Sequence, residues 1–243
     1  IIPETDFFIF ICCMNYDEKC IQADYLKDKY GINVADHVHK HGITPRQIFP
    51  LYAACRGQHE AVVRMLVEQK ADVTMQTRDG QTALWMSSWM GNANIVRILL
   101  HEMKRTLSRK EMSEIINRNY ITDSTPLRNA VKMGNSEVVS LLLDAKADVH
   151  KEDRSGSTVL HIAAAGNDDK CVALLTKHGA SINVTNKDGL SPLAMALRNH
   201  SFRSTLALVV THSKKKIHQK LTHVDKTSLL NAAANDKDGS GRR

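Results

Sequence analysis

The residues whose spacing comes closest to that of a metal site are three histidines at alternate positions, His37, His39 and His41. On an extended segment alternate side chains share one face, so three imidazoles could converge on a zinc ion. The neighbouring sequence offers no fourth ligand at a defined spacing, and the segment falls where an exposed connection is expected. The sequence therefore predicts neither a metal site nor a cofactor.

Another histidine, His161, stands at the start of an apolar helical stretch. A catalytic histidine needs a nucleophile and an orienting partner, and the sequence around His161 supplies neither. We expect His161 to be a buried residue that makes hydrogen bonds. Glycine-rich phosphate loops, paired histidines on a helix and nucleophile elbows are also missing from the sequence, so the chain is predicted not to be an enzyme.

The cysteines indicate a reducing environment. They stand at Cys12, Cys13, Cys20, Cys55 and Cys171. Their spacings match neither a zinc site nor a disulfide framework, and Cys55 and Cys171 fall on helix positions that face a core. We expect a cytoplasmic protein, with the nucleus as an alternative. The apolar stretch 7–14 is too short to span a bilayer, so no membrane segment is expected.

The elements that position these residues recur along the chain with a fixed period. Copies of a short phrase, Thr-Pro-Leu or a close variant, begin at Phe49, Thr82, Thr125, Thr158, Ser191 and Thr227. The steps between the four best copies, which begin at residues 82, 125, 158 and 191, are 43, 33 and 33 residues. A period of this length is the signature of stacked supersecondary units.

Each unit holds two short apolar stretches at helical spacing, about 15 residues apart. Thr or Ser at the start can cap the first helix, and Pro suits its first position. Asp-Gly or Ser-Gly pairs before three of the caps are typical of hairpin turns. Lys70 and Lys146 stand where a glycine would end the second helix, so either both adopt a left-handed backbone or those helices end differently.

This pattern resembles the ankyrin repeat, in which a β-turn finger precedes two antiparallel helices and the first helix begins Thr-Pro-Leu-His. The resemblance covers about residues 31–235 and is most specific in the copies that begin at residues 82, 125 and 158. His161 is the only signature histidine, and the residues that replace it in drifted copies are Trp85, Arg128, Ala194 and Leu230. The resemblance implies an all-α repeat solenoid, a stack of about six to seven helix-turn-helix units with β-hairpin fingers.

The resemblance also implies a domain organisation. We expect a degenerate N-terminal capping repeat at residues 1–36, ankyrin repeats at 37–235 and a flexible tail at 236–243. The long step places an insertion near residues 101–117, where Ser108 and Glu111 fit a capping box before a lengthened or extra helix. The insertion is either a docking element or a tolerated elaboration. Lys214-Lys215-Lys216 is a weak candidate for a nuclear-import or nucleic-acid signal, because basic runs are usually solvated loops.

In ankyrin stacks a partner usually binds the concave face formed by the fingers and the first helices. The positions that vary on that face are, in this chain, Arg46, Arg56, Arg78, Asp79, Gln81, Trp89, Met90, Lys132, Met133, Arg154, Ser155, Lys187, Asp188 and Arg198. Trp89, Met90 and Met133 would form an apolar centre within a basic rim. Trp89 is either an exposed anchor for a partner or a mostly buried side chain that covers the neighbouring helix.

The function that the resemblance implies is a non-enzymatic protein-interaction module, a scaffold or adaptor that is monomeric in isolation. A formal net charge of +7 and a basic rim favour an acidic protein partner with an apolar anchor, and no small-molecule substrate is expected. One alternative is a regulatory or targeting arm of a larger enzyme or ion channel. Nucleic-acid binding through the basic face is a third and less favoured hypothesis.

Two asparagines raise the question of modification. Asn183, and Asn117 after the insertion, occupy a position at which ankyrin repeats can be targets of an asparaginyl hydroxylase. The alternative, which we favour, is that these side chains stabilise the turn through their own hydrogen bonds.

Overall fold

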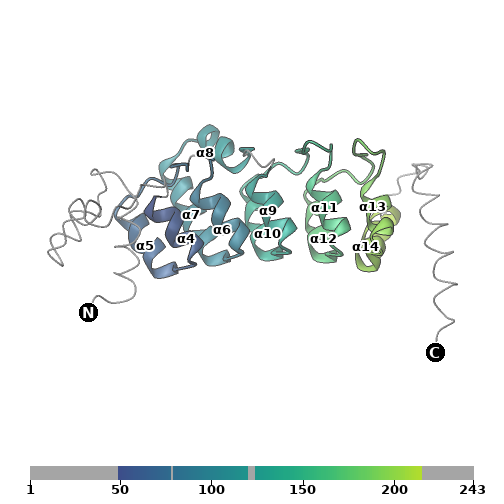
Figure 1. Cartoon of the computed structure of the whole chain (residues 1–243), viewed down its shortest axis with the longest axis horizontal. Coiled ribbons are helices and arrows are strands. Elements are labelled where there is room, and N and C mark those ends of the chain that lie inside the picture. Colours follow the sequence, from purple (N-terminus) through teal and green to yellow (C-terminus); the bar gives the residue numbers. More distant parts are fainter. Residues whose placement is uncertain (1–48, 78, 120–123, 215–243) are drawn as a thin grey trace, which may run out of the picture. The chain divides into compact units, whose positions relative to one another are not determined.

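A computed structural model describes residues 49–77, 79–119 and 124–214. Within these ranges every regular element is a helix (Figure 1). The chain divides into two compact units between Pro126 and Leu127. Several predictions lie outside the described residues: the capping repeat 1–36, the histidine cluster 37–41, Arg46, Arg78, the repeat that begins at Thr227, and the tail 236–243.

In its described residues the first unit contains two helix pairs followed by an extra helix. The helices are α4 (Pro50–Arg56), α5 (Glu60–Glu68), α6 (Ala83–Met90), α7 (Ala93–Thr106) and α8 (Arg109–Ile116). Helix α4 packs against α6 and helix α5 against α7, so that first helices form one layer and second helices another. Helix α8 follows the lengthened α7 and contacts it.

The second unit repeats the same arrangement in its described residues. Its helices are α9 (Pro126–Lys132), α10 (Ser136–Asp144), α11 (Val159–Ala165), α12 (Asp169–Lys177), α13 (Pro192–Arg198) and α14 (Phe202–Lys214). Helix α11 packs against α13, and the second helices α10, α12 and α14 contact one another in order. Figure 1 shows these pairs side by side, with the connecting fingers at one edge.

Helices α6, α8 and α13 begin where the sequence supplies a cap. Thr82 accepts a hydrogen bond from the Trp85 N–H at 3.2 Å, and Ser191 accepts one from the Ala194 N–H at 3.1 Å. Ser108 and Glu111 form a capping box, in which the Ser108 N–H donates to the Glu111 carboxylate at 2.8 Å. These bonds satisfy backbone donors that the first turn of a helix cannot pair internally.

The lysines that follow helices α5 and α10 adopt a left-handed backbone, which is one of the two outcomes expected from the sequence. Lys70 and Lys146 have φ values of 62° and 68°, and Asn167, in the turn between α11 and α12, has a φ of 57°. A left-handed backbone costs a residue with a side chain roughly 1 kcal/mol relative to glycine. The repeat geometry therefore overrides local preference at these positions.

The fingers are tight turns without extended strands. In the finger before α11, the Asp153 N–H donates to the Ser157 carbonyl at 3.1 Å, and the finger before α13 is closed by the Asn186 N–H and the Leu190 carbonyl at 3.0 Å. No strand is formed in the described ranges, because each turn is followed at once by the cap of a helix. The all-α repeat stack that the sequence predicts is confirmed.

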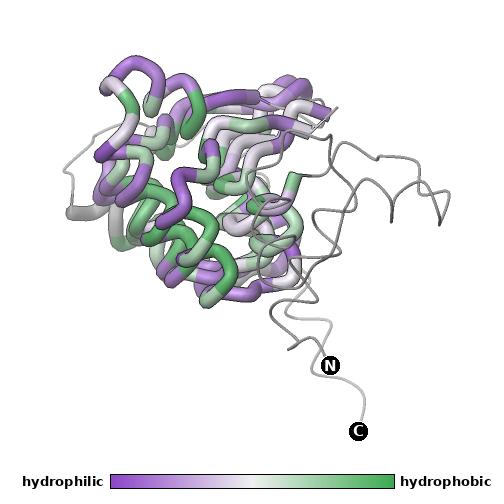
Figure 2. Tube along the Cα trace, turned by 90° about the vertical axis from the view of Figure 1, so that its left-hand side faces the viewer, coloured by the Kyte–Doolittle hydropathy of each residue, from purple (hydrophilic) through white to green (hydrophobic). Residues whose placement is uncertain are grey.

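The core lies between the first and second helices of each pair and between successive pairs. Its residues include Leu66, Ile95, Leu99, Leu127, Leu142, Leu160 and Leu175. Cys55 and Cys171 are fully buried, and burial raises the pKa of both thiols far above the usual range. Figure 2 shows hydrophobic stretches along the helices and hydrophilic residues at many of the turns. None of the helices described here is long and apolar enough to cross a bilayer.

Candidate functional site

His161 joins its own repeat to the finger that follows. Its side chain is fully buried, and the Thr158 N–H donates to Nδ1 at 3.1 Å. Because Nδ1 accepts this bond, the ring proton is on Nε2, which donates to the Leu190 carbonyl at 3.1 Å. The prediction that His161 is a buried hydrogen-bonding residue is confirmed.

Two of the residues that replace this histidine in other repeats make the equivalent hydrogen bond. Arg128 Nη2 donates to the Ser157 carbonyl at 2.7 Å, and Trp85 Nε1 donates to the Ser124 carbonyl at 3.2 Å. Each acceptor belongs to the residue directly before the next cap, as Leu190 does for His161. Three chemically different side chains thus serve as one inter-repeat donor, and the sequence reasoning, which treated two of them as drift, missed this.

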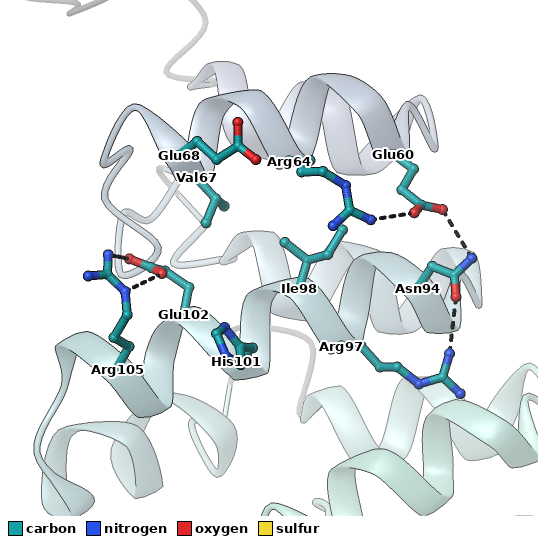
Figure 3. Close-up of a pocket in the computed structure, with 10 residues that line it drawn as sticks. All are labelled: Glu60, Arg64, Val67, Glu68, Asn94, Arg97, Ile98, His101, Glu102 and Arg105. Carbon is teal, nitrogen blue, oxygen red and sulfur yellow. Dashed lines mark hydrogen bonds and ion pairs between the residues drawn. The ribbon is translucent and has the colours of Figure 1, made fainter.

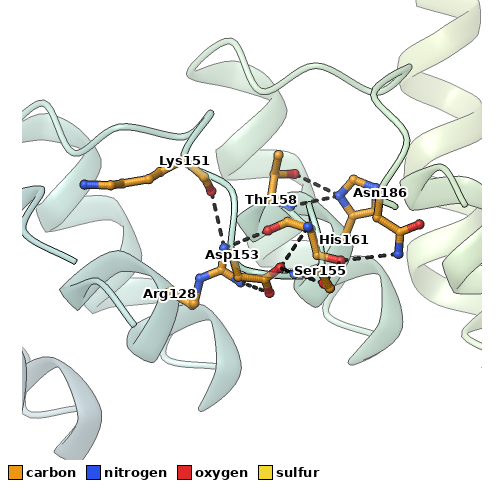
Figure 4. Close-up of polar contacts among 8 residues, drawn as sticks. Arg128, Lys151, Asp153, Ser155, Thr158, His161 and Asn186 are labelled. Carbon is orange, nitrogen blue, oxygen red and sulfur yellow. Dashed lines mark hydrogen bonds and ion pairs between the residues drawn. The ribbon is translucent and has the colours of Figure 1, made fainter. Parts of the chain in front are cut away.

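Arg128 adds an ion pair to its backbone bond. Its Nη1 lies 2.8 Å from the Asp153 carboxylate, and the two side chains are only 9% and 24% exposed. Burial disfavours the ionised form of Asp153, but hydrogen bonds from Ser155 and Ser157 and the charge of Arg128 outweigh it and lower the pKa of the carboxyl. Figure 4 shows Arg128 directed at the base of the finger. The pair therefore fixes the finger relative to α9.

The neutral state of His161 makes stability depend on pH. Burial lowers the pKa of His161 below 6.5, although the bond to Leu190 and nearby acidic groups oppose the shift. The unfolded chain then binds more protons than the folded chain, so the free energy of unfolding falls as the pH drops below about 6.5, by at most about 1.4 kcal/mol per pH unit. We expect His161→Gln, which keeps a donor and an acceptor but does not titrate, to lose this dependence.

Urea unfolding at several pH values between 8 and 5 tests this prediction. His150→Gln changes an exposed histidine and is the control, whose profile should follow the wild type. Parallel stability profiles for the wild type and His161→Gln would show that His161 does not titrate differently on folding.

In the first unit, the predicted partner-binding residues form two groups. Asp79 and Gln81 lie in the finger, where the Tyr52 hydroxyl donates to the Gln81 side chain, while Trp89 and Met90 end α6. Trp89 is half-buried and stacks on Trp85, with ring centroids 6.1 Å apart and planes at 13°. Trp89 is therefore neither the exposed anchor nor the mostly buried side chain that the sequence left as alternatives. Arg56, at the end of α4, is exposed.

In the second unit the predicted residues occupy both ends of the first helices. Lys132 ends α9, and Met133, which directly follows the helix, is 48% exposed. Arg198 ends α13 and is exposed. The exposed finger residues Arg154, Ser155, Lys187 and Asp188 lie at the other end. Seven helical residues span about 10 Å, so the predicted rim is a band along the first helices rather than a ring around one centre.

The two fingers of the second unit are joined by their backbones. The Lys187 N–H donates to the Ser155 carbonyl at 2.8 Å. A side chain at Gly156 would meet the Lys187 backbone at 3.2 Å, and Gly156 has a φ of 73°. This close approach explains the glycine, and it places Ser155 and Lys187, two of the predicted partner-binding residues, side by side.

A groove that the sequence reasoning missed lies between the second helices α5 and α7. It has a volume of about 640 Å³, and its lining residues are Glu60, Arg64, Val67, Glu68, Asn94, Arg97, Ile98, His101, Glu102 and Arg105 (Figure 3). Glu60 pairs with Arg64 at 2.9 Å and also accepts a hydrogen bond from Asn94 at 3.0 Å. The available signal was polar side chains four residues apart on both helices.

The Glu102 carboxylate at one end of the groove is buried and receives two hydrogen bonds from Arg105, at 2.7 and 3.0 Å. These bonds lower the pKa of Glu102 against the effect of burial. A carboxylate held ionised by arginine is not available as a general acid. The groove therefore has the character of a polar protein surface.

Comparison with known sequences identifies the repeat. Residues 9–111, 103–186 and 127–221 match the family described as "Ankyrin repeats (3 copies)". The chain belongs to the ankyrin-repeat family. Ankyrin repeats are in general non-catalytic protein-interaction modules, so the coarse functional class that the sequence predicts holds for this chain.

Similar proteins contain ankyrin segments within longer chains. This chain is 36% identical over 152 residues to the Nuclear factor NF-kappa-B p105 subunit of Gallus gallus, over 61% of this chain and 15% of that protein. It is 33% identical over 163 residues to the B-cell lymphoma 3 protein homolog of Mus musculus, which covers 67% of this chain and 34% of that protein. It is 35% identical over 100 residues to a probable serine/threonine-protein kinase of Dictyostelium discoideum, which covers 39% of this chain and 12% of that protein. The chain thus spans about a third or less of each relative.

The asparagines that ankyrin hydroxylases could modify have different surroundings. Asn183 is exposed after α12. Asn117 is the C-cap of α8, and its side chain lies 3.4 Å from the Ser113 hydroxyl. Hydroxylation of either residue stays a prediction. Within the described ranges, no three His, Cys, Asp or Glu side chains are grouped so that they could hold a metal ion.

Proposed function

We propose that this ankyrin-repeat chain is a scaffold or adaptor module that binds a protein partner along its fingers and first helices. The observation that carries the proposal is the exposure of Met133, because a large apolar side chain that is 48% exposed on a folded repeat is an effective anchor for a partner. Lys132, directly before it, is also exposed. In the first unit Met90 occupies the equivalent repeat position, beside Trp89.

The charges along this face favour an acidic partner. Arg154, Lys187 and Arg198 are exposed on the fingers and at the end of α13 of the second unit. Basic side chains at the edge of an interface mainly accelerate association with acidic partners and make binding sensitive to salt. A partner with an apolar anchor between acidic residues fits this band of methionine, lysine and arginine.

Affinity capture from lysate with Lys132→Glu/Met133→Asp tests the proposal. We expect the affinity of the double variant for the partner to be at least about tenfold lower, equivalent to about 1.4 kcal/mol or more. The matched control is Ala173→Asp/Lys177→Glu, which makes the same kinds of change at exposed positions of the second helix α12. Equal capture by the wild type and the first variant would overturn the proposal, as would equal losses by both variants.

A second candidate function is a regulatory or targeting arm of a larger enzyme or channel. The similarity to a segment that makes up 12% of a probable protein kinase favours this candidate. A full-length transcript that encodes a catalytic or channel domain next to the repeats would support it, and one that encodes ankyrin repeats alone would reject it.

Binding to nucleic acid predicts a different response. Counterion release makes such binding weaken steeply with salt, and loss of an apolar side chain should change it little. Nuclease treatment of the lysate before capture separates the two hypotheses, since it should leave a protein partner bound.

A further inference from the structure

The outer side of α14 carries three exposed apolar residues in one row. Phe202, Leu206 and Val210 are 67%, 66% and 42% exposed. They stand four residues apart, so they align along one side of the helix over about 12 Å. We call these three residues the α14 row. The opposite side of α14 is buried through Ser204 and Leu208.

The corresponding positions of the other second helices are polar or small. In α5 they are Glu60, Arg64 and Glu68; in α7, Ala93, Arg97 and His101; in α10, Ser136, Ser140 and Asp144; and in α12, Asp169, Ala173 and Lys177. Among the described second helices, only α14 has apolar residues at all three positions. The row is therefore not a requirement of the repeat.

A further repeat of the same chain would not cover the row. Helix α5 is followed by α7, yet Arg64 is still 57% exposed at the position equivalent to Leu206. Helix α12 is followed by α14, and Ala173 is also exposed. By contrast, Val67 and Thr176, which correspond to Val209, are buried where a second helix follows. Stacking thus buries the position of Val209 and leaves the α14 row at the surface.

The sequence segment that carries the row has no acidic residue, although Asp168 and Asp169 of the adjacent helix α12 lie near the N-terminal end of α14. Between residues 189 and 224 the sequence contains no Asp or Glu, and its basic residues are Arg198, Arg203, Lys214, Lys215, Lys216 and Lys220. These residues account for six of the seven units of formal net charge of the chain. A second copy of the chain would bring a like-charged region against this one, which disfavours self-association here.

We propose that the α14 row is a second docking surface, and that its occupant is an acidic amphipathic helix of a partner protein. A helix laid along α14 would match the row with apolar side chains at i, i+3, i+4 and i+7 and place acidic side chains near Arg198 and Arg203, the exposed basic residues of this segment within the described ranges. The surface lies on a second helix, so the proposal does not depend on the one made above for the fingers and first helices.

The first step of the test measures whether the row is accessible in the full chain. Leu206→Cys should react with a thiol reagent as fast as Ala173→Cys, its exposed equivalent in α12, after subtraction of the wild-type signal. Protection of Leu206→Cys in the monomer would show that the chain itself covers the row and would overturn the proposal. Protection that appears only at high protein concentration, with a dimer in sedimentation, would assign the row to a second copy and also overturn it.

The second step uses a synthetic helical peptide of about 18 residues with leucine at i, i+3, i+4 and i+7 and glutamate elsewhere. We expect saturable binding by fluorescence anisotropy, weakened at least about tenfold by Leu206→Glu and unchanged by Ala173→Glu. A matched peptide with lysine in place of glutamate should not bind. Equal binding of both peptides, no binding of the acidic peptide, or binding to phosphatidylserine vesicles in its place would overturn the proposal. Circular dichroism confirms that each variant is folded.

Discussion

Replacing Trp85 with alanine is expected to destabilise the first unit by about 3–5 kcal/mol. The side chain is 7% exposed, so the substitution leaves a large cavity. It also removes the donor to the Ser124 carbonyl at 3.2 Å and the ring that stacks on Trp89. Urea unfolding followed by circular dichroism measures the loss.

Two further variants separate the roles of Trp85. Trp85→Phe keeps an aromatic ring but removes the Nε1 donor, so it should cost less than the alanine variant, by a margin that reflects the retained burial. Trp89→Ala changes the half-buried partner of the stack and should also cost less. If Trp85→Ala costs under about 1 kcal/mol, Trp85 does not join the repeats as described.

Replacing Arg128 with methionine is expected to destabilise the second unit by about 2–4 kcal/mol. Methionine fills much of the same volume, but the Asp153 carboxylate loses its ion pair at 2.8 Å and the Ser157 carbonyl loses its donor at 2.7 Å. The cost of leaving such groups unpaired exceeds the net value of the pair itself. Thermal and urea unfolding both report the change.

The control for this prediction is Arg198→Met, the same substitution at an exposed position, which should change stability by less than about 0.5 kcal/mol. Because the pKa of Asp153 is lowered in the folded protein, the stabilisation by this group is present above pH 3.8 and is lost as the pH falls through the folded value. The difference between wild type and Arg128→Met should therefore shrink in acid. If the difference stays constant as the pH falls through the pKa that Asp153 has in the folded protein, the role given to the ion pair is contradicted.

Much of the fold could be predicted from the sequence because the constraints are local. The Thr and Ser caps mark the starts of helices, the Ser108–Glu111 pair defines the start of α8, and the period places Lys70 and Lys146 at left-handed positions. Each of these features depends on residues a few positions apart. A repeat supplies the remaining long-range contacts by copying one interface from unit to unit.

The inter-repeat donors could not be predicted because the period fixes a position but not the reach of its side chain. Trp85, Arg128 and His161 differ in length and charge, yet each reaches a carbonyl before the next cap. The surroundings of Trp89 depend on the ring of Trp85, four residues earlier on the same helix. That spacing was a usable signal, since aromatic residues four apart on a helix meet on one face.

The candidate site was less accessible to sequence reasoning than the fold. The sequence indicates which positions face a partner in ankyrin stacks, but exposure depends on what neighbouring side chains cover. Met133 is exposed, whereas Trp89, the residue that was expected to be the strongest anchor, is half-buried. The groove between α5 and α7 depends on side chains of both helices, and Arg97, His101 and Arg105 line it on the α7 side.

The most direct test of the central claim, that the first-helix side binds a protein, is site-specific photocrosslinking in cells. A benzophenone amino acid replaces Met133 in the full chain, and Lys170, exposed on α12, is the control site. The account predicts a discrete protein adduct at position 133, rich in acidic residues at the crosslinked segment and absent from position 170. Adducts of equal yield at both sites, recovery of nucleic acid in place of protein, or no adduct at position 133 would contradict it.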